Sequence, residues 1–474
     1  MQTRTLSREN NNLLRRTWSG TMVVDYKLFL LVGAVCFNIL NTGAALAQDN
    51  SINSVGKTKK CFPYIEKLPE QKLMAAPLES ANLAHKTYML PATPATTQWG
   101  VYNNHQPPVL TINPGDSISI ETMAASDNQV VPGTPIEEVV RMNNAVPGRG
   151  PHTITGPVYI QGAEPGDVLK IHFNKILPRS YASNNNVPGK GLFPEEFPEG
   201  QIKYFYLDVK KMQMQFAPGI VIPLAPFPGL IAVAHEKSGD FDTIPPGPFG
   251  GNMDLREMKE GTTLYLPVFV KGGLLWTGDS HAGQGNGEIN LTAIETAYEE
   301  FNITVDLLKH TPLSWPRVET PDAWIAVGYD ADLNKALDIL KGETIKLIMD
   351  QRKVSPEQAE QIMFATWNCP ISEVVNGVKG VYCMVPKKSE KQTPFLLPKT
   401  DTPTQYVTYA KDNDIENAMK KASMTMLNRI AAEKKLTRLD TYSLLSLTMD
   451  CRMAPYKTGE KEVHCMLDKN LWIS

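Results

Sequence analysis

The chain has 474 residues, of which 42% are hydrophobic and 20% charged, and its formal net charge is -3. This length exceeds what one hydrophobic core supports, so we expect two or three domains. The slightly acidic balance gives no support for nucleic-acid binding, which would need a basic stripe. The 36 prolines and 33 glycines, many of them in Pro-Gly or Gly-Pro pairs, favour many short strands joined by turns.

The N-terminal segment has the pattern of an export signal. The apolar run "LFLLVGAVCFNIL" is too short to cross a bilayer comfortably, and it leads into an Ala-x-Ala site at Ala45 and Ala47. We therefore expect residues 1–47 to be a signal peptide and the mature chain to be periplasmic or secreted, without stable membrane association. The alternatives are a translation start at Met22, a twin-arginine signal and an uncleaved anchor.

Residues 88–269 show a strand-and-turn pattern. Both "NPGDSISIE" and "EPGDVLKIHF" place a Pro-Gly-Asp turn before an alternating strand, and "GTTLYLPVFV" is a third strand of this kind. We read "SYASNNNVPGKGLFPEEFPEG" as a long polar loop, and no helical period persists. The sequence predicts a β-sandwich or barrel core, divided into an N-terminal β domain over 48–225 and a β-barrel segment over 226–318.

The C-terminal third contains a sequence repeat. Residues 320–387 align without a gap on residues 402–469, and 15 of these 68 positions are identical. Each copy has the pattern of a strand, two helices and a hairpin. We therefore expect a mainly β protein with two C-terminal α/β units, 319–388 and 400–474, that arose by internal duplication. The alternative is chance similarity between two α/β segments.

The cysteines of each unit are placed for a hairpin bridge. Thirteen residues separate Cys369 from Cys383 and Cys451 from Cys465, and a turn dipeptide, Asn-Gly or Thr-Gly, lies midway. Equal distance from the turn puts the two cysteines of a pair opposite each other on adjacent strands. In an exported protein this predicts two disulfides and leaves Cys61 out. The alternative is reduced cysteines in the core.

The stretch "WTGDSHAGQGNGE", residues 276–288, is the main candidate site. Asp279 and His281 are two residues apart on an extended ribbon, so both side chains project to the same face. The glycines allow close approach of the backbone, and Glu288 is a further ligand or a general base. The alternative is a glycine-rich hairpin with solvated polar tips.

Two other stretches carry polar candidates. "HTITGPVYIQGAEPGDVL" begins at His152, which is either a ligand or substrate contact or a hydrogen-bonded structural histidine. "IPPGPFGGNMD" ends in Gly250, Gly251, Asn252, Met253 and Asp254. This turn either presents backbone N–H groups to an oxyanion or is simply an Asn/Asp-capped turn.

These stretches resemble the acetamidase/formamidase family. The resemblance runs over about residues 88–387 and rests on "TGPVYIQGAEPGDVL", "PPGPFGGNMD" and "GDSHAGQGNGEI". It implies a β-rich hydrolase that converts short aliphatic amides to a carboxylate and ammonia, with a divalent metal at the site. The partner would be a small-molecule amide, with no nucleic acid, and we also expect a homo-oligomer.

The residues agree with this chemistry because the usual nucleophile signatures are missing. The chain has no Gly-x-Ser-x-Gly motif, so water activated by a metal, zinc or alternatively calcium, is the economical nucleophile. We expect metal ligation by Asp279, His281 and Glu288, catalytic roles for Glu288, Asn252 and Asp254, and substrate binding by His152, Gly250, Gly251 and Gln284. A loop histidine contributes little core, so His281→Ala should leave the fold intact.

One residue departs from the family pattern. The family's ribbon usually carries an acid where this chain has Asn286. If that acid binds metal, the affinity should change, whereas a turn-shaping role would suit Asn equally well. The second hypothesis is therefore a catalytically altered or inactive binding or scaffold protein on the same fold. A third is a β-barrel metalloenzyme of another class, such as a sugar isomerase.

Overall fold

The structure is a computed structural model that describes residues 85–388 and 395–473. The chain divides into two units, residues 1–80 and 81–474, and everything described below belongs to the second. The expected signal peptide and Cys61 lie outside the described residues, so these expectations stay predictions. Among the described helices, none has both the length and the hydrophobicity of a membrane span.

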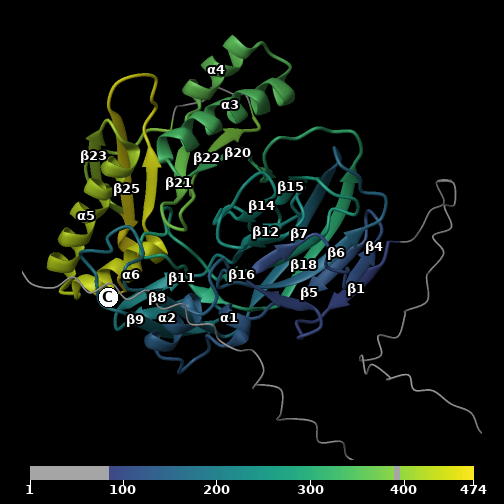
Figure 1. The fold of residues 1–474 in the computed structure, drawn as a ribbon. Helices are drawn as coiled ribbons and strands as arrows, with labels where there is room; N and C mark the ends of the chain where they lie inside the picture. Colours follow the sequence, from purple (N-terminus) through teal and green to yellow (C-terminus); the bar gives the residue numbers. More distant parts are fainter. Residues whose placement is uncertain (1–84, 389–394, 474) are drawn as a thin grey trace, which may run out of the picture. The chain divides into compact units, whose positions relative to one another are not determined.

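The larger sheet runs through the whole second unit (Figure 1). In spatial order its twelve strands are β1 (Thr87–Leu90), β5 (Ser117–Ile120), β18 (Tyr298–Leu308), β7 (Val168–Pro178), β15 (Thr263–Pro267), β19 (Arg317–Glu319), β20 (Ala323–Asp330), β22 (Lys379–Pro386), β21 (Cys369–Glu373), β24 (Asp450–Met453), β25 (Lys461–Asp468) and β23 (Gln405–Asp412).

The second sheet has eleven strands and carries the candidate ribbon. Its path is β11 (Ile220–Pro223), β10 (Gln213–Ala217), β9 (Gln201–Asp208), β8 (Tyr181–Asn186), β17 (Glu295–Thr296), β16 (Leu275–His281), β12 (Phe227–Ala232) and β14 (Gly250–Asn252). Beside β16 lies β6 (Thr153–Ile160), which also pairs with β2 (Thr97–Trp99) and β4 (Leu110–Ile112). A two-stranded sheet joins β13 (Asp240–Asp242) to β3 (Val101–Asn103).

The expected fold class is confirmed: the molecule is mainly β, with α/β units at the C-terminal end. Each strand expected after a Pro-Gly-Asp turn forms, as β5 and β7, and the third forms as β15. Alternating apolar and polar residues predict a strand because successive side chains face opposite sides of a sheet. In β5, Ile118 and Ile120 are buried at 0% and 2% exposure and help to build one of two large apolar clusters.

The expectation of no helix before residue 269 is wrong. The structure forms α1 (Ala125–Asn128) and α2 (Ile136–Asn144) there. Helix α2 has acids in its first turn and buries Val139 and Met142, three residues apart on one face. The polar stretch after residue 180 is also not all loop, because strand β8 forms and its three asparagines are buried. Asn184 is kept there by hydrogen bonds to Thr292.

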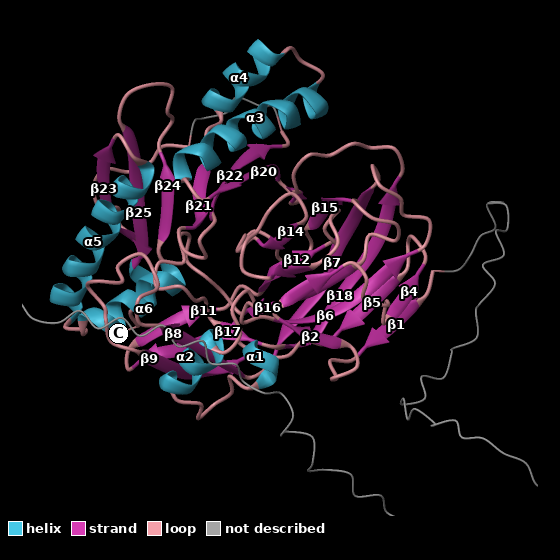
Figure 2. Cartoon of the chain, viewed as in Figure 1, coloured by secondary structure: helices cyan, strands magenta, loops and turns pink. Residues whose placement is uncertain are grey.

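The two C-terminal units have the same order of elements. The first contains β20, α3 (Leu333–Arg352), α4 (Pro356–Ala365), β21 and β22. The second contains β23, α5 (Ile415–Lys434), α6 (Arg438–Thr448), β24 and β25, followed by the 3-10 turn η1 (Lys469–Leu471). In each unit the long helix packs on the strand before it and on the last hairpin strand (Figure 2). Internal duplication remains a prediction about how this order arose.

The two units join through equivalent hairpin strands. Strand β21 pairs with β24 in antiparallel fashion, with Cys369 opposite Met453. The expected disulfides are confirmed: Cys369 bonds to Cys383 and Cys451 to Cys465. Cys451 and Cys465 are also direct cross-strand partners, as equal spacing about the turn requires. The pairing of β21 with β24 covers a strand edge in each unit.

Candidate active site

The ribbon is a buried part of the second sheet. Strand β16 lies between β12 on one side and β6 and β17 on the other, so its backbone is paired along both edges. Residues 281–290 are all buried, and His281 has 1% exposure. The expectation that His281 is a loop histidine that contributes little core is therefore wrong. Replacing His281 by Ala would leave a cavity and uncompensated buried acids, so that variant is a poor test of function.

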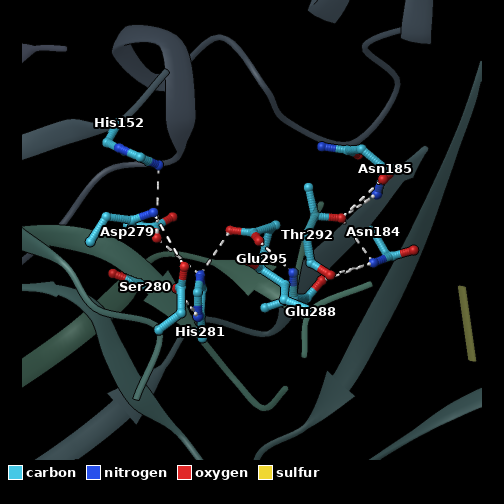
Figure 3. A network of polar contacts seen from close by, with 12 residues as sticks. His152, Asn184, Asn185, Asp279, Ser280, His281, Glu288, Thr292 and Glu295 are labelled. Carbon is cyan, nitrogen blue, oxygen red and sulfur yellow. Dashed lines mark hydrogen bonds and ion pairs between the residues drawn. The ribbon is translucent and has the colours of Figure 1, made fainter. Parts of the chain in front are cut away.

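Carboxylates approach both nitrogens of the His281 ring, and Figure 3 shows Asp279 and Glu295 beside it. His281 Nε2 lies 3.1 Å from Asp279 Oδ2 and 3.5 Å from Glu295 Oε2, while Nδ1 lies 3.7 Å from Asp254 Oδ1. Neither ring nitrogen makes a hydrogen bond of good geometry, and Asp254 Oδ1 also has no partner. Buried polar atoms are usually paired, and a bound ion is one of the partners that such a cluster could take.

Gly229 leaves the space in which Asp279 and His281 meet. A Cβ built on Gly229 would lie 2.5 Å from Asp279 Oδ2, 2.5 Å from His281 Cε1 and 2.9 Å from His281 Nε2. Only a residue without a Cβ therefore fits beside this pair. The backbone of His281 is also fixed, since its carbonyl accepts a hydrogen bond of 2.9 Å from the hydroxyl of Tyr298.

A second group of acids lies on the Nδ1 side of the ring. Asp254, Glu288 and Glu373 are buried at 1%, 3% and 0% exposure. The Asn376 amide donates to all three, at 3.2 Å to Asp254, 3.5 Å to Glu288 and 2.8 Å to Glu373. Asn252 donates to the same Asp254 oxygen at 3.2 Å. The two amide groups thus donate hydrogen bonds to carboxyl groups that would otherwise repel one another.

The electrostatics follow from burial and crowding. Burial raises the pKa of Asp254 to about 8, and burial followed by the neighbouring Asp254 raises the pKa of Glu288 well above its usual range. Burial opposes ionisation of Asp279 and His281, but each stabilises the charge of the other. The pKa of Asp279 is therefore lowered and the pKa of His281 is raised. With Glu295, four carboxyl groups lie around the imidazole, a set that favours a cation.

Three site acids have strained backbones. Asp254, Asp279 and Glu288 each have φ of 46°, in the left-handed region that non-glycine residues rarely adopt. Each such residue costs on the order of 1–3 kcal/mol and persists where the surroundings impose it. The coincidence of this strain at three carboxyl groups around one histidine is typical of a functional site.

Three of the site acids line a cavity of about 660 Å³. Its wall includes His152, Asn252, Asp279, Glu288 and Glu295. His152 is buried, lies 3.0 Å from Thr243 Oγ1 through Nδ1, and turns Nε2 to within 3.8 Å of Asp279. Sequence candidates from the separate stretches thus meet on one cavity wall.

Other candidates do not face the cavity. Gly250 and Gly251 pair with Ala232 and Ile231 of β12, where a Cβ would meet Ile231 O and the Phe249 ring. Their role here is close packing, and they do not line the cavity. Gln284 is buried with both amide atoms unpaired, and it does not line the cavity either.

The proposed oxyanion turn is also corrected. The backbone N–H groups of Met253 and Asp254 both donate to Gly229 O, at 3.0 and 3.2 Å, so neither is free to bind a substrate oxygen.

Asn286 points away from the site acids. Its amide donates to Asp450 Oδ1 at 2.7 Å, and its oxygen accepts from the Tyr382 hydroxyl at 3.1 Å. Asp450 belongs to the second C-terminal unit and also binds Arg452 at 2.8 Å. Asn286 is not among the residues that line the cavity. The amide at this position therefore affects how the ribbon packs against the second C-terminal unit.

Both C-terminal units hold the ribbon. In the first, Gly287 donates to Ser372 O at 3.0 Å and accepts from Val374 N at 3.1 Å. In the second, Gly285 donates to Ser446 O at 2.9 Å, and the Ser446 hydroxyl accepts from Asn290 N at 3.1 Å. The position of Glu288 is thus set from both sides.

Sequence reasoning missed several site residues. Glu295 is the direct cross-strand partner of His281, and Glu373 forms a bridge with Gly287. Gly229 and Asn376 were also missed, although Asn376 lies in the recognised Asn-Gly turn. The expected ligands Asp279, His281 and Glu288 do not form one group. Two groups share His281, one with Asp279 and Glu295 and one with Asp254 and Glu288.

Comparison with known proteins finds similarity to one family. The acetamidase/formamidase family model matches residues 92–241 and 236–321. Over these residues, just under half of its length, the chain is similar to the acetamidase/formamidase family. It is 24% identical over 278 residues to an acetamidase of Mycolicibacterium smegmatis, covering 46% of this chain and 67% of that protein.

Solved structures agree with the family in fold. An acetamidase from Yersinia enterocolitica has a TM-score of 0.59 and 26% identity, and covers 65% of this chain and 94% of that one. An acetamidase from Bacillus halodurans has a TM-score of 0.57 and 25% identity, with coverage of 63% and 97%. The chain spans between 62% and 67% of the length of the curated family relatives it matches.

Proposed function

We propose that the protein hydrolyses the C–N bond of small carboxamides to give a carboxylate and ammonia. The observation that carries this proposal is that Asp279, Glu295 and Glu288 line a cavity and lie close to His281, whose buried ring nitrogens are unpaired. Similarity to proteins named acetamidase and formamidase supports the same reaction.

The residues fit a divalent cation. Asp279, His281 and Glu295 each offer one ligand atom, and these atoms lie within 4.8 Å of one another. This group is the better candidate because Asp279 and Glu295 both face the cavity, as a catalytic site with an open position requires. On the other side of the ring, Asp254 is placed to orient Nδ1. Zinc is our first choice and calcium the alternative.

When bound, a divalent cation supplies Lewis acidity toward the amide carbonyl. Glu288, on the cavity wall, is placed to take a proton from water as the water oxygen bonds to the carbonyl carbon. The same carboxyl then gives that proton to nitrogen as the C–N bond breaks and ammonia leaves. His152 holds Asp279 from the far side, and Asn252 and Asn376 hold Asp254.

Ammonia release tests the proposal. Formamide, acetamide and propanamide are incubated with the protein before and after chelation, and metal content is measured on the same samples. Glu288→Gln should keep the metal and lose on the order of 10²–10⁴ in kcat. Glu199→Gln, an exposed change outside the cavity wall, is the matched control. Full activity in Glu288→Gln, or no activity on any amide with metal present, would contradict the proposal.

We also propose that the chain is exported and that it forms a homo-oligomer. The Ala-x-Ala site before Gln48 supports export, as do two disulfides, which persist in oxidising compartments. The intact mass of the protein recovered from the periplasm or medium should correspond to a chain that starts at Gln48. Light scattering gives the oligomeric state.

A further inference from the structure

Resting on the amidase function proposed above, we propose that the preferred substrate is a primary amide whose apolar chain ends in a carboxylate. The inference comes from the outer wall of the cavity, which the reaction itself does not use. This wall is apolar over much of its area and carries an excess of cations.

The cavity is much larger than a short amide. Its volume is about 660 Å³. Acetamide has four non-hydrogen atoms and would fill about a fifth of it, if each atom takes roughly the 30 Å³ of a water molecule. Several wall residues are apolar side chains: Val130, Val139, Leu192, Leu291, Val374 and Val375. Each methylene of a substrate buried against them should improve kcat/KM about fourfold.

A triad of charged residues from both C-terminal units lines the same cavity. Lys379 and Lys420 share the carboxylate of Glu416; Lys420 Nζ lies 2.8 Å from Glu416 Oε1, and Lys379 contacts the other oxygen. Two ammonium groups on one carboxylate leave one positive charge without a counter-charge. A substrate carboxylate would supply it.

Two more cations line the cavity. The Arg149 guanidinium lies 3.4 Å above the centre of the Trp99 ring, and Lys190 is exposed. In the described part of the chain, neither is paired with a carboxylate. The outer wall thus carries four cationic side chains and one acid, Glu416. The four cations are Arg149, Lys190, Lys379 and Lys420.

The depth of these charges orients the substrate. The Glu288 residue and the Asp279 side chain are 3% and 9% exposed, whereas the Lys379 and Lys420 side chains are 19% and 41% exposed. The buried acids repel a carboxylate, and the lysines nearer solvent attract it, so the amide end enters first. Lys379 is three residues along the chain from Asn376, which bonds to Glu288, and this backbone spans at most about 10 Å.

The test compares three amides: acetamide, hexanamide and 6-amino-6-oxohexanoate, which has the hexanamide chain with a terminal carboxylate. We expect kcat/KM to rise from acetamide to hexanamide, and to rise again about tenfold for the carboxylate amide. This second gain should shrink as salt is added, because salt screens partly exposed charges. Cleavage of acetamide with no gain for the carboxylate amide would overturn this inference alone. Cleavage of none of the three would overturn the amidase function as well.

Charge variants give a second, independent test. Lys420→Gln should lower the ratio of kcat/KM for 6-amino-6-oxohexanoate over hexanamide about tenfold. Glu416→Gln, which frees both lysines, should raise that ratio. Lys210→Gln removes the same charge from an exposed position outside the cavity wall and should leave the ratio unchanged. An unchanged ratio in Lys420→Gln, or an equal fall in Lys210→Gln, would overturn the inference.

Discussion

Asn286→Asp restores the acid that the family's ribbon usually carries, and it tests why this chain differs. In the structure, the Asn286 amide donates 2.7 Å to Asp450 Oδ1, and Asn286 is 2% exposed. An aspartate has no hydrogen there to donate. The substitution therefore replaces a charge-assisted hydrogen bond by two carboxylates in contact.

The expected loss of stability has an upper bound. Two like charges about 4 Å apart at an effective dielectric constant of about 20 repel by about 4 kcal/mol. Protonating one carboxyl at pH 7 instead, from a pKa near 3.9, also costs about 4 kcal/mol. Arg256 at 3.2 Å and Arg452 at 2.8 Å from Asp450 reduce the repulsion. We expect the free energy of unfolding to fall by about 2–3 kcal/mol at pH 7.

The loss should depend on pH. Contact with Asp450 raises the pKa of the new carboxyl in the folded state above its unfolded value of about 3.9. The penalty is therefore absent below about pH 4 and grows as pH rises toward the folded-state pKa. Urea unfolding at pH 4.5 and pH 7 measures it, with Gln361→Glu on the exposed face of α4 as the charge control. Wild-type stability at pH 7, or a loss that is equal at both pH values, would refute the reasoning.

Three further outcomes are expected. Gly229→Ala puts a Cβ 2.5 Å from Asp279 Oδ2 and should abolish metal binding and activity. Gly342→Ala adds a Cβ in open space and is the control that should keep both. An active Gly229→Ala protein would contradict the site geometry. Burial would raise the pKa of Asp450, but Arg256 and Arg452 lower it to about 2; Asp450→Asn should be less stable than wild type at pH 7, and the difference should vanish as pH falls from about 4 to 2. Replacing both Cys451 and Cys465 by Ser should lower the free energy of unfolding by up to about 3 kcal/mol in thermal or urea unfolding; no change would argue against that bridge.

The parts of the fold that sequence predicted depend on local rules. Pro-Gly-Asp turns set the start of β5 and β7, and spacing about a turn set both disulfides. Helix α2 was missed because Pro and Gly surround it, although Pro135 at its N-cap and acids in its first turn are helix signals. Local patterns thus give elements with strong punctuation and miss a short helix between turns.

The site was predicted only as far as one strand could show it. Asp279 and His281 meet because alternation along β16 places them together. Glu295 reaches His281 through the register of β16 with β17, and Glu373 reaches the ribbon through a bridge to Gly287. These contacts depend on strand pairing between distant segments, which no local pattern contains.

The glycines of the ribbon have a structural reason that the sequence alone did not show. A Cβ on Gly285 would lie 2.7 Å from Met449 O, and a Cβ on Gly287 would lie 2.4 Å from Met419 Cε. Both contacts come from the second C-terminal unit, so the close approach that these glycines allow is an approach to that unit. Glu288 follows directly, in a left-handed conformation that this packing imposes. The family match ends at residue 321, before the second C-terminal unit begins. This unit therefore helps to set the geometry of Glu288, the proposed general base.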